Sequence, residues 1–238
     1  APRIDEKRFP DVENVIVLDK SVVSFQFDEQ KQATIAIHEK TLQKRILRKN
    51  QDIPKPFLFL IISTPQFTIT DIGGRIVKPD GREIPLNEEI TYENIHTELQ
   101  SQHKLIQVRY ENTEVGDFIE LKWKETISDL TALHPYVFGN QYPILRAEFT
   151  VNIPPGFEID YYTSRKGNKI LWDPEIFILP KEQGRRLFWL KKNIPPIFSE
   201  SQGDTIEFLS DTAYLGFVRY KHHISVAGYE TWDQLARK

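Results

Sequence analysis

Hydrophobic side chains recur at every second residue along much of this chain, and this period of two limits its fold more than any other feature. The pattern is clearest in VVSFQF (22–27), FIELKWK (118–124) and EFTVNI (148–153). In the first of these, Val23, Phe25 and Phe27 point to one face of a strand, and the Ser and Gln between them point to the other. Half-buried strands of this kind are typical of antiparallel sheets.

Short turn sequences separate the predicted strands. Gly, Asn, Asp or Pro interrupts the strand pattern at DEQK (28–31), KPDGRE (78–83), VGD (115–117), PPG (154–156), KGN (166–168) and QGD (202–204). In KPDGRE, Pro79 has a φ angle suited to a turn and Gly81 can adopt positive φ. We therefore predict an all-β fold, a large antiparallel β-sandwich of about a dozen or more strands with little helix.

The length of 238 residues fits one large sandwich, and we predict a single all-β domain over residues 1–226. The chain ends in ETWDQLARK (230–238), where Thr231 and Gln234 form the pattern of a helix capping box. We expect residues 227–238 to be a linker and the first turns of a helix. Because a helix of about two turns is only marginally stable alone in water, we expect it to lead into a further domain.

Several kinds of catalytic site are excluded by what the sequence lacks. The chain has no cysteine, which excludes a disulfide framework, a thiolate zinc site and a cysteine nucleophile. The adjacent pair His222-His223 would point to opposite faces of a strand, so it cannot readily bind one ion. No P-loop, dinucleotide-binding, nucleophile-elbow or HExxH motif occurs. We predict no catalytic residue, no metal site and no cofactor.

Charge and hydropathy exclude two classes of partner. The net charge of −3 does not indicate a nucleic-acid surface. The longest apolar run, FLFLII (57–62), is far shorter than the roughly 20 residues that span a bilayer. We expect neither nucleic-acid binding nor a membrane span.

Aromatic residues are the candidates for a ligand-binding surface. The segment 129–143 lacks clean alternation and is rich in aromatic side chains, so it either packs on the sandwich or faces a partner. Exposed rings could stack on a peptide or a glycan, whereas core packing is the other interpretation of each ring. The candidate binding residues are Tyr136, Phe138, Tyr142, Trp172 and Trp189. Trp123 alternates with core positions and is assigned to the interior.

Several pieces of the chain, in a fixed order, resemble one protein family. They are IVKPDGREIPL (76–86), LIQVRYENTEVGDFIELKWKETI (105–127), HPYVFGNQYPILRAEFTVNIPPGFEIDY (134–161) and FWLKKNIPPIFSE (188–200). Within them stand Gly116-Asp117, Tyr142-Pro143 and the turn Pro154-Pro155-Gly156. From about Val15 onward the chain resembles the domain of unknown function that directly precedes the transglutaminase-like domain in exported bacterial proteins.

The resemblance implies a non-catalytic N-terminal accessory domain that docks on, or positions substrate for, a C-terminal transglutaminase-like domain of the same polypeptide. The whole protein would then be a transglutaminase-like cysteine protease or amidase with a signal peptide, in the periplasm or cell envelope of a Gram-negative bacterium. Its catalytic Cys, His and Asp would lie in the following papain-like domain, and ETWDQLARK is similar to the first turns of that domain's opening helix. A carbohydrate- or peptide-binding module is the alternative, and a hydrolase that uses carboxylates or histidines is a third hypothesis.

Overall fold

A computed structural model describes Phe9 and residues 12–48, 57–64, 66–86, 90–95, 103–110, 113–166, 168–180, 184–197, 206–220 and 223–226. Strands dominate these residues, and the prediction of an all-β fold with little helix is confirmed. The helical segments described are the 3-10 turn η3 (Leu130–Ala132) and the single turn α1 (Ile206–Leu209). Neither approaches the length and apolar character of a membrane-spanning helix.

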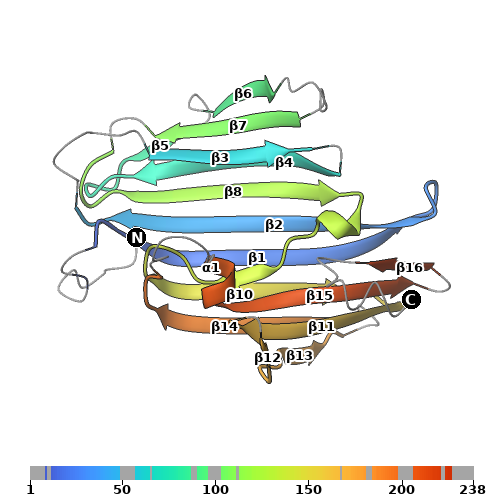
Figure 1. The fold of residues 1–238 in the computed structure, drawn as a ribbon. Helices are drawn as coiled ribbons and strands as arrows, with labels where there is room; N and C mark the ends of the chain where they lie inside the picture. Colours follow the sequence, from blue (N-terminus) through green and yellow to red (C-terminus); the bar gives the residue numbers. More distant parts are fainter. Residues whose placement is uncertain are drawn as a thin grey trace.

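The strands form one large sheet and two smaller ones (Figure 1). The large sheet has eight strands in the order β13-β14-β10-β1-β2-β8-β4-β5. Their bounds are β1 (Asn14–Asp28), β2 (Ala33–Ile46), β4 (Phe67–Val77), β5 (Glu83–Pro85), β8 (Phe118–Ile127), β10 (Ile144–Ile153), β13 (Glu175–Ile178) and β14 (Arg185–Ile194).

The smaller sheets are assembled from the remaining strands. A five-stranded sheet contains β9 (Tyr136–Phe138), β11 (Phe157–Arg165), β12 (Asn168–Ile170), β15 (Asp211–Tyr220) and β16 (His223–Val226). A three-stranded sheet has the order β3-β7-β6, with β3 (Phe57–Ser63), β6 (Ile90–Ile95) and β7 (His103–Tyr110).

The large sheet is mixed, because one of the described strand pairs is parallel within the predicted antiparallel arrangement. Strand β10 pairs antiparallel with β14 but parallel with β1, with Ser21 opposite Phe149. Alternation of hydrophobic residues reports which face of a strand is buried and carries no information on the direction of its neighbour. The parallel pair joins strands that are far apart in the sequence, which is the kind of contact that a local pattern does not reveal.

Two hydrophobic cores lie on the inner face of the large sheet. The larger core joins β14, β10 and β1 to the five-stranded sheet, through residues such as Phe149, Trp189 and Phe138. The smaller core joins β8 and β4 to the three-stranded sheet, through residues such as Leu121, Ile76 and Val108. The two small sheets therefore cover different halves of the same face.

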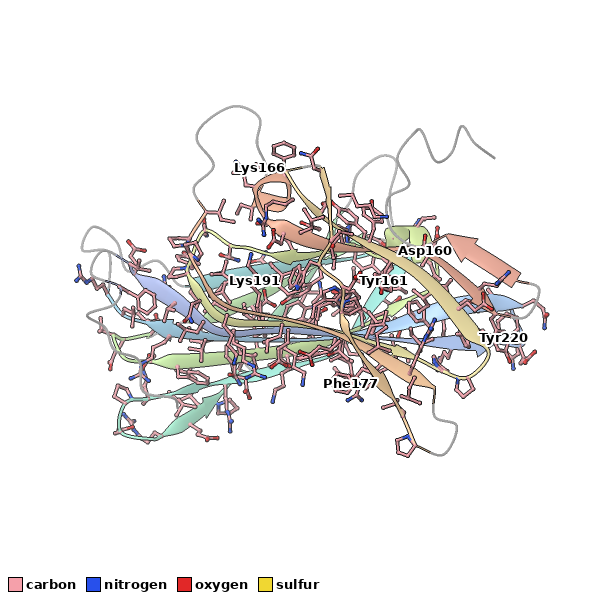
Figure 2. The ribbon with its side chains drawn as sticks, turned by 90° about the horizontal axis from the view of Figure 1, so that it is seen from below. Asp160, Tyr161, Lys166, Phe177, Lys191 and Tyr220 are labelled. Atoms are coloured by element: carbon pink, nitrogen blue, oxygen red, sulfur yellow. The ribbon has the colours of Figure 1, made fainter. Side chains whose placement is uncertain are left out.

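An ion pair fastens the large sheet to the five-stranded sheet. Lys191 on β14 lies 2.7 Å from Asp211 on β15, and the Nη2 atom of Arg165 on β11 lies 2.9 Å from the same carboxylate. Burial raises the pKa of Asp211, but these two cations outweigh it and hold that pKa below its usual value. Figure 2 shows Lys191 and Tyr161 between the two sheets.

The predicted turns are found where the structure describes them. Gly81, Gly116 and Gly156 all have positive φ, as the turns KPDGRE, VGD and PPG require. The turn QGD and the helix expected in residues 227–238 lie outside the described residues, and so does Gly167 of KGN.

Candidate functional site

The five aromatic residues proposed for ligand binding lie in or against the larger core. Tyr136, Phe138 and Trp189 are 8%, 0% and 1% exposed. Tyr142 and Trp172 are partly buried and pack on the same core. These rings contact one another and the sheets, so they do not form an exposed platform on which a glycan or peptide could stack.

The aromatic segment 129–143 packs against the sandwich. It contains the turn η3, whose Leu130 is buried, and the strand β9, which pairs with β15. The ring of Tyr136 stacks on Phe149 with centroids 5.0 Å apart, and the Tyr136 hydroxyl donates a hydrogen bond to the carbonyl of Asp19 at 2.9 Å. Of the two interpretations of this segment, packing on the sandwich is the one that the structure shows.

Polar side chains lie on the inner face of the large sheet at the junction of its two cores. Ser21 on β1, His38 on β2 and Glu125 on β8 form a hydrogen-bonded chain across three adjacent strands. The Ser21 hydroxyl contacts Nε2 of His38, and Nδ1 of His38 lies 3.1 Å from Oε2 of Glu125. The sheet register places His38 opposite Val23 on one side and opposite Glu125 on the other. We call Ser21, His38 and Glu125 the Ser-His-Glu chain.

Two further side chains bind the second oxygen of Glu125. Nε1 of Trp123 donates a hydrogen bond to Oε1 at 2.8 Å, and Nζ of Lys40 lies 3.5 Å from the same oxygen. Lys40 also lies over the Trp123 ring, 5.5 Å from its centroid. Both oxygens of the buried carboxylate therefore have partners, as burial of a charge requires.

The protonation states of His38 and Glu125 in the Ser-His-Glu chain follow from these contacts. Burial lowers the pKa of His38, and the positive charge of Lys40 lowers it further. Burial raises the pKa of Glu125, but the hydrogen bond from His38 and the charge of Lys40 outweigh it, so this pKa lies well below its usual value. At neutral pH the imidazole is therefore neutral and the carboxylate is ionised. With this charge state, Nδ1–H of His38 donates to Glu125 and Nε2 accepts from Ser21.

This arrangement has the order of groups found in a nucleophile, base and carboxylate triad. Its access and surroundings differ from those of a serine nucleophile that a substrate can reach, because Ser21 is 1% exposed and His38 is 5% exposed. Ser21 also lies in the middle of β1, paired on one side with β2 and on the other with β10. Its neighbouring backbone amides therefore belong to the sheet ladder, where they are not directed at a reacting carbonyl.

Asp19 is a further polar residue on this inner face. It lies two residues before Ser21 on β1, on the same face of the strand, and it is half-buried beside Tyr136. Burial raises the pKa of Asp19 from 3.8 to about 6, although the charge of Lys40 partly offsets it. The folded protein therefore binds a proton here more readily than the unfolded chain does, between those two pH values.

Replacement of Asp19 by Asn is expected to stabilise the protein at pH 8 by about 1–3 kcal/mol and to have little effect near pH 4. A raised folded-state pKa contributes stability that is present below the unfolded value of 3.8 and is lost as pH rises through about 6. Denaturant unfolding at both pH values measures the difference. The variant Glu39→Gln, on the exposed side of β2, is the control. A loss of stability in Asp19→Asn at pH 8 would contradict this account of Asp19.

The sequence holds a partial signal for the Ser-His-Glu chain. Ser21 shares the inward parity of Val23 and Phe25, and Glu125 shares that of Trp123 and Ile127. A polar residue at an inward position marks a buried polar group. Only the pairing of β1, β2 and β8 shows that the three residues meet.

The fold and this site define a class of protein. It is an all-β module built on a mixed eight-stranded sheet, with the buried Ser-His-Glu chain at the junction of two hydrophobic cores. The chain belongs to the family DUF3857, a Domain of Unknown Function with a solved structure, whose family model matches residues 64–198. The match covers more than half of the chain. No curated protein sequence matches this chain.

The fold is shared by a solved structure. A crystal structure described as a "putative protease" from Parabacteroides distasonis has a TM-score of 0.66 and 12% identity, over 85% of this chain and 40% of that chain. Two structures of leukotriene A4 hydrolase, one described as from Saccharomyces cerevisiae and one as the yeast enzyme, have TM-scores of 0.40 and identities of 10% and 11%. Each covers 86% of this chain and 29% of the hydrolase. This chain thus spans less than half the length of these structures.

Proposed function

We propose that this chain is a non-catalytic accessory module of a longer polypeptide, which docks on a catalytic domain or positions substrate for it. The observation that carries this proposal is the likeness to the Parabacteroides structure, in which the shared fold occupies 40% of a longer chain described as a "putative protease". The burial of the Ser-His-Glu chain supports the same interpretation, because it leaves the most triad-like group of this module without access to a substrate.

The family resemblance of the sequence adds the identity of the partner to this proposal. We propose a C-terminal transglutaminase-like domain that supplies the Cys, His and Asp of a cysteine protease or amidase. The absence of cysteine from this chain is consistent with that division, since a thiolate is the nucleophile in such chemistry. By the same resemblance, we propose export by a signal peptide to the periplasm or cell envelope of a Gram-negative bacterium.

The Ser-His-Glu chain provides the sharpest test of the non-catalytic proposal. A fluorophosphonate probe reacts with an activated serine hydroxyl that it can reach. We expect the native protein to show no more labelling than the variant Ser21→Ala, and no turnover of nitrophenyl acetate or of a generic peptide above the same background. A serine hydrolase labelled in parallel confirms that the probe is active.

Labelling that requires both Ser21 and His38 would overturn the proposal. The variant His38→Gln distinguishes an activated hydroxyl from an incidentally exposed one, because the second does not need the imidazole. Circular dichroism of each variant confirms that it is folded.

A further inference from the structure

The two edges of the large sheet differ in the side chains that they present to another strand. Native proteins protect sheet edges with proline, charged residues or bulges. Strand β5 forms one edge and contains Pro85, and its Glu83 pairs with Arg75 at 2.9 Å. Strand β13 forms the other edge and pairs only with β14 in the part of the chain that the structure describes. Its one charged residue is Glu175 at its start, directly after Pro174, and its remaining three residues are apolar and in regular register with β14.

The edge at β13 also carries exposed apolar side chains. Leu171, just before this strand, is 95% exposed. Ile176, Phe177 and Ile178 of the strand are 55%, 45% and 79% exposed. Four large exposed hydrophobic residues therefore lie within eight positions, more than single scattered surface residues would give.

Both faces of β13 present these side chains. Ile176 lies opposite the buried Leu187, so it and Ile178 are on the inner side of the sheet. Phe177 is on the outer side, with its ring 6.4 Å from that of Phe188. Figure 2 shows Phe177 on the opposite side of the large sheet from Tyr161 and Lys191. A strand added at this edge could bury apolar side chains on both of its faces.

The segment that leads into β13 is anchored in the core. The Trp172 ring lies 4.6 Å from the Phe138 ring. The carbonyl of Trp172 accepts hydrogen bonds from Nε1 of Trp189 and from the hydroxyl of Thr163, each at 3.3 Å. The edge is thus held in place before any partner arrives, which lowers the entropic cost of binding.

We propose that β13 is the docking edge for an extended strand of the partner domain, which it adds to the large sheet by main-chain hydrogen bonding. This inference rests on the accessory function proposed above. The added strand would carry alternating apolar residues, and a basic residue near Asp173 and Glu175. These two carboxylates give the start of β13 a negative charge that a basic residue would complement, whereas Arg185 and Arg186 of β14 lie opposite the other end of the strand.

The small size of the edge favours a strand in the same polypeptide over a second copy of the chain. β13 has four residues. A pair of such strands buries much less than the roughly 1,200 Å² that a stable interface between separate proteins needs. A strand tethered in the same polypeptide has a high effective concentration and binds through a smaller contact.

Hydrogen exchange measured by mass spectrometry tests this proposal, on the 238-residue chain and on the longer polypeptide that carries the partner domain. Peptides spanning residues 171–180 are expected to exchange their amide hydrogens at least about tenfold more slowly in the longer polypeptide than in the 238-residue chain. The variant Ile178→Lys should restore fast exchange there, because it places a charge in the apolar contact. Val115→Lys is the matched control, since Val115 is also exposed, at 46%, but lies far from this edge in the sequence.

The outcomes separate the two proposals. If another surface of this chain gains protection from hydrogen exchange while residues 171–180 still exchange fast, the assignment of β13 as the docking edge is wrong and the accessory function stands. If no part of the chain gains protection, docking itself is refuted, and the edge assignment with it. Protection of residues 171–180 that rises with concentration in the 238-residue chain alone would show a second copy as the occupant and overturn the proposal.

Discussion

Replacement of Asp117 by Ala is expected to lower the free energy of unfolding by about 3–5 kcal/mol, because it removes the nearer counter-charge of the buried Lys78. The other carboxylate near Lys78, that of the exposed Glu114, is 4.0 Å away. Asp117 is 0% exposed, and its Oδ2 lies 2.9 Å from Nζ of Lys78, which is itself buried. The same oxygen accepts the amide of Glu114 at 2.7 Å. The backbone carbonyl of Asp117 accepts the amide of Ile46 at 3.0 Å, so this residue joins the ends of β2, β4 and β8.

Chemical unfolding near pH 7 measures this effect. The control is Asp80→Asn, which removes an exposed ion pair with Arg82 in the neighbouring turn and should change stability far less than Asp117→Ala does, because solvent screens this pair. A second variant, Asp117→Asn, keeps the shape and some of the hydrogen bonding and is expected to fall between the two. Equal losses in Asp117→Ala and Asp80→Asn would show that burial of the Lys78–Asp117 pair has no consequence.

Replacement of Trp189 by Ala is expected to cost about 3–5 kcal/mol of stability through the cavity that it leaves. Trp189 is 1% exposed, and its ring lies 5.3 Å from that of Phe149 and 5.4 Å from that of Tyr161. Its Nε1 atom also holds the carbonyl of Trp172, so the substitution removes a hydrogen bond between the two segments. Thermal and denaturant unfolding of the purified variant measure the loss.

The exposed Leu171 provides the control for this substitution. Leu171→Ala should change the free energy of unfolding by no more than about 0.5 kcal/mol, because the side chain is almost fully solvated. Trp189→Phe retains most of the ring volume and should restore a large part of the stability. A fully stable Trp189→Ala variant would contradict the packing role and return Trp189 to the candidates for ligand binding.

These two substitutions concern residues that the sequence marks in different ways. The Gly116-Asp117 turn is visible as a break between strands, and the positive φ of Gly116 confirms it. The burial of the Asp117 carboxylate is not visible there, since turn aspartates are commonly solvated. Trp189, between charged neighbours in RRLFWLKKN, is compatible with a surface or a core position. Its burial depends on the five-stranded sheet that covers it.

The sequence by itself determines which residues form strands, where turns interrupt them and which face of each strand is buried, because these properties depend on alternation and on the φ preferences of Gly and Pro. It also places Ser21 and Glu125 at inward positions. Only the tertiary structure decided the parallel pairing of β10 with β1 and the meeting of Ser21, His38 and Glu125. It also decided that the apolar strand β13 lies at an edge of the large sheet. Strand order and register depend on contacts between distant segments, and a local pattern does not record which strand becomes the neighbour of which.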